Sequence, residues 1–158
     1  TILLERDRFG MEASVTSDCA PLWNAVKASL EAAYDIHVIR DATRGGVGTV
    51  LYEIADQSNV GIKLNTEAVP VNSEVAGVTG MLGLEPLYLA CEGRLVMFVP
   101  EKSADAVLAA LHSSDHTEGA VVIGEVTEEM PGHVVMTTEI GTESLLPPPS
   151  GELLPRIC

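Results

Sequence analysis

The chain has few aromatic and few basic side chains. Its 158 residues include 3 Tyr, 2 Phe and 1 Trp, and 9 Lys and Arg stand against 23 Asp and Glu, which gives a formal net charge of −14. An acidic surface repels phosphate backbones and anionic lipid, and a chain poor in aromatic rings has little with which to stack bases. Nucleic acid and membrane surfaces are therefore not expected as partners.

Long apolar runs and paired cysteines are also missing. No run reaches the roughly 18 apolar residues of a spanning helix, and the first residues lack the order of a secretory signal. Cys19, Cys91 and Cys158 are too widely spaced for a CxxC metal site and too few for a disulfide framework. The sequence predicts a cytoplasmic protein with reduced thiols. Because Thr1 stands in what reads as structured sequence, we expect the chain to be part of a longer protein.

The composition nevertheless supplies a core, since 46% of the residues are hydrophobic and only 20% are charged. Helical periodicity predicts helices near residues 20–33, 47–59, 73–82 and 103–113. Strands are predicted at 36–40, 62–64, 87–90 and 94–99, and a hairpin-like pair at 121–126 and 133–136. Strands that alternate with amphipathic helices indicate an α/β or α+β sandwich.

The last fourteen residues, LLPPPSGELLPRIC, contain four prolines and no periodicity. Proline removes a hydrogen-bond donor and favours extended polyproline geometry. We therefore divide the chain into a folded α/β domain, residues 1–144, and a flexible C-terminal tail, residues 145–158. From Leu146 to Cys158 the tail would span up to about 40 Å when fully extended.

A polar, glycine-rich turn, residues 41–48 (DATRGGVG), joins a predicted strand to a predicted helix. Backbone N–H groups in such a turn can approach an anion, although the spacing matches neither the dinucleotide fingerprint nor the phosphate loop. Asp41 could hold a metal ion and Arg44 a phosphate oxygen. Alternatively, Asp41 and Thr43 cap the helix while the glycines permit tight packing, and the spacing by itself favours this structural role.

Two further residues carry potential chemistry. Glu92 lies in a predicted turn between apolar strands, where a carboxylate can act as a base, although a simple ion pair with Arg94 would also explain it. Cys158 ends the tail, where an accessible thiol would suit a covalent carrier. The alternative for Cys158 is an incidental terminal cysteine.

Two of these features together indicate a family. The segment 41–47 (DATRGGV) with its amphipathic helix, and the terminal Pro155-Arg156-Ile157-Cys158, resemble the C-terminal half of the HypE family of hydrogenase maturation factors. The resemblance extends through residues 17–20, 92–96 and 123–126, and thus over nearly the whole chain. The first segment alone would indicate only the wider superfamily of aminoimidazole ribonucleotide and selenophosphate synthetases. Cys91 departs from the family pattern, in which a polar residue precedes the acidic one.

The resemblance implies a three-layer α/β/α sandwich with a mixed sheet, partly ferredoxin-like. It also implies an ATP-dependent carbamoyl dehydratase of [NiFe]-hydrogenase maturation. In this family a HypF-type carbamoyltransferase loads the terminal cysteine, dehydration gives a thiocyanate, and the cyanide passes to iron on a HypC–HypD scaffold. The N-terminal half would supply most of the site for ATP and Mg²⁺ and the homodimer interface. This chain alone is therefore expected to be monomeric and inactive.

The resemblance also assigns roles to residues. Cys158 would be the covalent carrier and Glu92 the catalytic base. Asp41 would help to hold Mg²⁺ on the nucleotide, and Arg44, with the backbone of Gly45 and Gly46, would bind phosphate. Two other functions remain as alternatives: a non-enzymatic module that presents a C-terminal peptide to partners, and another synthetase of the superfamily, such as selenophosphate synthetase, whose chemistry does not need a terminal cysteine.

Overall fold

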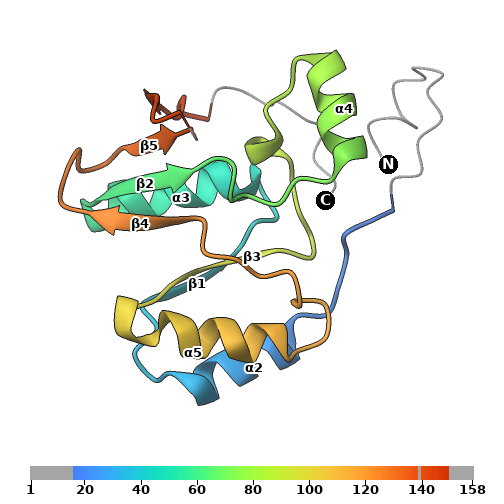
Figure 1. The fold of residues 1–158 in the computed structure, drawn as a ribbon, viewed down its shortest axis with the longest axis vertical. Coiled ribbons are helices and arrows are strands. Elements are labelled where there is room, and N and C mark those ends of the chain that lie inside the picture. The colour runs from blue at the N-terminus through green and yellow to red at the C-terminus, as the bar shows by residue number, and fades with distance from the viewer. Residues whose placement is uncertain (1–15, 139, 150–158) are drawn as a thin grey trace.

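The computed structural model describes residues 16–138 and 140–149, which form a mixed α/β fold (Figure 1). The helices are α2 (Trp23–Ala32), α3 (Gly46–Ser58), α4 (Ser73–Leu82) and α5 (Glu101–His112), with a short 3₁₀ helix, η1 (Pro86–Tyr88). The strands are β1 (Val38–Asp41), β2 (Gly61–Asn65), β3 (Leu95–Phe98), β4 (Gly124–Thr127), β5 (Val134–Thr137) and β6 (Glu143–Leu145).

The described strands form two sheets. β1 and β3 pair antiparallel, with Asp41 opposite Leu95. The other sheet has the order β4-β2-β5-β6, in which β2 runs antiparallel to β4 and parallel to β5. The predicted α/β class and mixed sheet are therefore confirmed.

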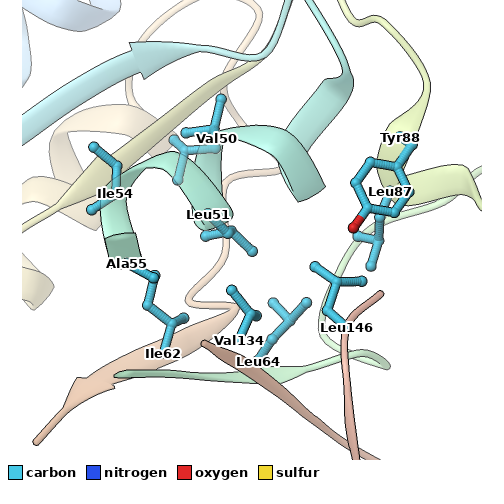
Figure 2. Close-up of a cluster of buried hydrophobic side chains, with 11 residues drawn as sticks. Val50, Leu51, Ile54, Ala55, Ile62, Leu64, Leu87, Tyr88, Val134 and Leu146 are labelled. Carbon is cyan, nitrogen blue, oxygen red and sulfur yellow. The ribbon is translucent and has the colours of Figure 1, made fainter. Parts of the chain in front are cut away.

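The helices cover these sheets from different sides. Figure 1 shows α2 and α5 side by side at one end of the molecule, next to β1 and β3. α3 packs on β2 and β5 and contributes the apolar face that the sequence predicted. Figure 2 shows the resulting core, in which α3 faces the four-stranded sheet and Leu146 lies beside the ring of Tyr88. Leu64, Val134 and Leu146 are at most 1% exposed.

The four predicted helices are all present. Each was predicted from periodicity within one short segment, which is a local property of the chain. α3 ends where the sequence indicated, because Asn59 takes the left-handed conformation (φ 52°) that asparagine tolerates at a helix end.

Two strand predictions are wrong. Residues 87–90 form no strand: Pro86 starts η1, and the Glu85 carboxylate accepts a hydrogen bond from the N–H of Leu87, both of which favour a helical turn. β4 and β5 do not pair as a hairpin, because β2 lies between them and contributes the buried side chains of Ile62 and Leu64. β6 was not predicted.

Packing continues past the predicted start of the tail. Leu145 ends β6, and Leu146 is fully buried, with its N–H donated to the carbonyl of Val134 at 2.9 Å. An apolar side chain that fills the core outweighs the effect of the prolines that follow. The prediction for Cys158 lies outside the described residues.

Gly46 should tolerate no side chain. Its φ is +63°, and a Cβ there would lie within 2.5 Å of the carbonyl oxygen of Leu87 and closer still to that of Leu89. Because both obstacles are backbone atoms, we expect Gly46→Ala to lower the free energy of unfolding by about 3 kcal/mol or more, measured by denaturant unfolding of the full-length protein. Gly80→Ala is the control, since its Cβ would meet no atom within 4 Å. Equal stability of the two variants would refute this assignment.

Candidate functional site

Asp41 ends β1 at the start of the glycine-rich turn. The hydroxyl of Thr43 donates to Asp41 Oδ2 at 2.6 Å, and this bond is the main cause that lowers the pKa of the Asp41 carboxyl. Asp41 is thus an exposed carboxylate at neutral pH. No side chain caps α3, which begins after Gly45, so the alternative in which Asp41 and Thr43 cap this helix is wrong.

The glycines of the turn allow close packing. A Cβ on Gly48 would lie 2.6 Å from Cε1 of Tyr88, and Gly46 lies against the backbone of η1. These glycines therefore let the N-terminal end of α3 pack directly on η1 rather than on a sheet. Arg44 is exposed and forms no ion pair within the described residues, whereas Arg40 pairs with Glu53 at 2.8 Å.

The structure brings the turns of Asp41 and Glu92 together. Ala42 is fully buried between them: its N–H donates to the carbonyl of Arg94 at 3.1 Å, and its carbonyl accepts the N–H of Cys91 at 3.0 Å. Glu92 is exposed, and in the described part of the chain no ion pair joins it to Arg94. Two candidates fifty-one positions apart therefore lie in adjacent turns.

The segment around Asp18 packs against the Glu92 turn. Gly93 donates its N–H to Asp18 Oδ2 at 3.4 Å, and a Cβ on Gly93 would collide with the Asp18 carbonyl. The thiol of Cys91 donates to the carbonyl of Leu89 at 3.3 Å, and burial is the main cause that raises its pKa. Burial and the raised pKa thus favour the protonated form of the half-buried Cys91 thiol, which disfavours a role as nucleophile.

The described residues contain no group of three His, Cys, Asp or Glu side chains arranged to hold a metal ion. A shallow, open hollow is lined by Asn65, Glu67, Ala68, Thr137 and Thr138. Asn65 ends β2 and Thr137 ends β5, so this hollow lies at the end of a different sheet from the one that contains Asp41. Within the same described ranges, no helix combines the length and apolarity needed to cross a membrane.

Two tyrosines that the sequence analysis did not single out contact the start of the tail. The Tyr52 hydroxyl donates to the carbonyl of Leu146 at 2.5 Å, and the Tyr88 hydroxyl donates to the carbonyl of Pro147. Burial raises the pKa of Tyr88 to about 12. In the sequence, the sign of such a contact was Tyr52, which lies within the apolar pattern of α3. A tyrosine buried on such a face needs a hydrogen-bond partner for its hydroxyl.

The raised pKa of Tyr88 predicts an alkaline limit to stability. The native state binds the phenol proton more tightly than the unfolded chain does, so the stabilisation is complete below about pH 10 and is lost as the pH rises towards 12. Because the phenol is only partly shielded from solvent, screening reduces the full effect, and we expect Tyr88→Phe to abolish a loss of about 1 kcal/mol over this range. Tyr34→Phe, at a 95% exposed position, should leave the loss unchanged. Unfolding measured at several alkaline pH values tests this, and equal slopes for both variants would contradict it.

Comparison with known proteins places the chain in a family. The family model described as "AIR synthase related protein, C-terminal domain" matches residues 2–136, and the chain belongs to this family. It is 42% identical over 158 residues to "Carbamoyl dehydratase HypE" of Rhodobacter capsulatus, which covers all of this chain and 46% of that relative.

Solved structures agree with this relationship. A structure titled "Crystal Structure of Hydrogenase Maturation Protein HypE in complex with ATP" matches with a TM-score of 0.89 at 44% identity, covering 100% of this chain and 48% of that one. A chain of "Crystal structure of HypE-HypF complex" matches with a TM-score of 0.88 at 34% identity, covering 94% and 48%. The chain thus spans about half the length of the relatives it matches, and the fold that the resemblance implied is confirmed.

Proposed function

We propose that this chain is the C-terminal half of an ATP-dependent carbamoyl dehydratase of [NiFe]-hydrogenase maturation. The observation that carries the proposal is the match of the entire chain, at 42% identity, to a relative named carbamoyl dehydratase. Our chain ends in Cys158, the kind of residue that such a reaction requires as a carrier.

The reaction converts an S-carbamoyl group (a thiocarbamate, S–C(=O)–NH₂) on Cys158 into a thiocyanate, S–C≡N. The carbonyl oxygen leaves as phosphate after ATP activates it, and both N–H protons must be removed. A carboxylate base near the reacting group suits this step, and Glu92 is the residue we assign to it. The S–C bond then breaks as the whole C≡N group passes to iron, which is a substrate held by a partner. This cleavage yields a thiolate and a cyanide ligand and takes up two electrons, which the iron-bearing partner would supply.

The Asp41 turn would face the nucleotide. Its carboxylate is ionised and exposed, so it can offer one oxygen to Mg²⁺, the hard cation that accompanies ATP. Because the described residues hold no group of three potential ligands, the other ligands would be phosphate oxygens and residues beyond this chain. Arg44, which is exposed, and the backbone of Gly45 and Gly46 would contact phosphate.

The proximity of the two turns supports this arrangement. The hydrogen bonds of Ala42 to Arg94 and Cys91 join the two turns, which supports assigning the base and the nucleotide contacts to one site. Oxygen activation and proton removal occur on the same small group, so such proximity is necessary.

The partners follow from the same proposal. A HypF-type carbamoyltransferase would load Cys158, in keeping with the HypE–HypF complex among the similar structures. A HypC–HypD scaffold would receive the cyanide, the full-length protein would form a homodimer in the cytoplasm, and this half alone would be monomeric.

Intact-protein mass spectrometry tests the proposed function. The full-length protein is incubated with its carbamoyltransferase, carbamoyl phosphate, Mg²⁺ and ATP. We expect the mass of a carbamoyl group to appear on Cys158 and then to decrease by one water. A wild-type protein that binds its partners but never carries an adduct would instead indicate a peptide-presenting module. A released phosphorylated product without an adduct would indicate another synthetase of the superfamily.

A further inference from the structure

The start of the tail is fixed to the domain at consecutive residues. We call Leu145–Pro147 the tail root. The Leu146 side chain is fully buried, and its N–H donates to the carbonyl of Val134 at 2.9 Å. The hydroxyls of Tyr52 and Tyr88 then donate to the carbonyls of Leu146 and Pro147, respectively. Prolines follow at once, so the direction in which the chain leaves the domain is set at this point.

The two tyrosines come from the elements that the glycine-rich turn brings together. Tyr52 lies on α3 and Tyr88 on η1. Gly48, in the first turn of α3, leaves room for the Tyr88 ring, because a Cβ would lie 2.6 Å from its Cε1. The Tyr88 ring thus contacts Gly48, the last residue of the glycine-rich turn, while its hydroxyl contacts the tail root. Figure 2 shows this ring next to Leu146.

We propose that Tyr88, seated against Gly48 and assisted by Tyr52, is a positioning residue that fixes where the tail with Cys158 leaves the domain. This inference rests on the proposed function of Cys158 as a carrier. It goes beyond that function because it names the residues, Tyr88 and Tyr52, that set how far the Cys158 thiol can move from the domain.

The reach of the thiol depends on this anchor. Cys158 lies eleven positions after Pro147, which allows up to about 36 Å when the chain is extended. If the tail root detached together with β6, back to Thr142, Cys158 would lie sixteen positions after the last anchored residue, which allows about 53 Å. The volume open to Cys158 would then increase roughly threefold, and its effective concentration at the Glu92 turn would decrease accordingly.

The hydrogen bonds are suited to a lasting anchor. Burial raises the pKa of both phenols, that of Tyr88 to about 12, so both remain donors throughout the physiological range. Phenylalanine at either position would keep the ring and remove only the donor. The variant Tyr88→Phe therefore separates the hydrogen bond from the packing.

The experiment combines hydrogen–deuterium exchange with single-turnover kinetics on the full-length protein. We expect Tyr88→Phe to speed exchange at the Leu146 amide about tenfold, and the double variant with Tyr52→Phe to speed it further. Gly48→Ala should have the same effect, because it displaces the ring. The controls are Tyr34→Phe, 95% exposed, and Gly77→Ala, whose Cβ would meet no atom within 4 Å.

The second readout is dehydration of carbamoyl groups preloaded on Cys158. Tyr88→Phe should lower its rate constant roughly threefold while the KM for ATP is unchanged, a split that general destabilisation would not give. Exchange at the control level in Tyr88→Phe, or raised exchange with an unchanged rate constant, would overturn the inference. Raised exchange in a protein whose wild type carries no adduct would confirm the anchor and overturn the proposed function instead.

Discussion

A full-length Cys158→Ser protein should form no thiocyanate. A serine hydroxyl stays protonated near neutral pH and is a far weaker nucleophile than a thiolate, so the carbamoyl group has no carrier. We expect the intact mass to remain unchanged after incubation with the carbamoyltransferase, carbamoyl phosphate and ATP.

The other cysteines provide the controls for this result. Cys19 is an exposed free thiol, so Cys19→Ser tests whether any accessible cysteine can be loaded. Cys91 is half-buried, and its thiol donates to Leu89. Both serine variants should keep the adduct on Cys158. Full activity of Cys158→Ser, or loss of the adduct in Cys19→Ser, would assign the carrier role elsewhere.

Glu92→Gln should slow dehydration by about 100- to 10,000-fold, the usual contribution of a positioned base. Glutamine preserves the size of the side chain and removes the basic oxygen. Loading of Cys158 should proceed normally, because the base is assigned only to the removal of N–H protons. The carbamoyl adduct should therefore accumulate in the mass spectrum at the expense of the thiocyanate.

Glu128→Gln is the matched control. Glu128 is another exposed glutamate outside the helices and strands, and it follows β4, which belongs to a different sheet from β1 and β3. It should retain wild-type dehydration. If Glu92→Gln also retained it, the base would have to be sought on other residues near Ala42. If Glu92→Gln failed to be loaded, Glu92 would act in partner binding rather than in dehydration.

Part of the site could be read directly from the residues. Asp41, Arg44 and Glu92 were named as candidates from their place in turns, and in the structure all three residues are exposed. Their proximity could not be predicted, because it depends on the hydrogen bonds that Ala42 makes to Arg94 and Cys91. The same holds for the packing of Gly48 against Tyr88, where the two residues are forty positions apart.

By itself, the sequence determined the class of fold, the helices and the residue types available for chemistry. Helical periodicity, a left-handed Asn59 and a run of prolines act within a few residues, so they can be read without the rest of the chain. Only the tertiary structure decided that β2 separates β4 from β5, that Leu146 enters the core and that Tyr52 and Tyr88 bind the tail root. These contacts join segments far apart in sequence, and they form because burying apolar side chains and pairing polar groups is favourable only in the assembled core.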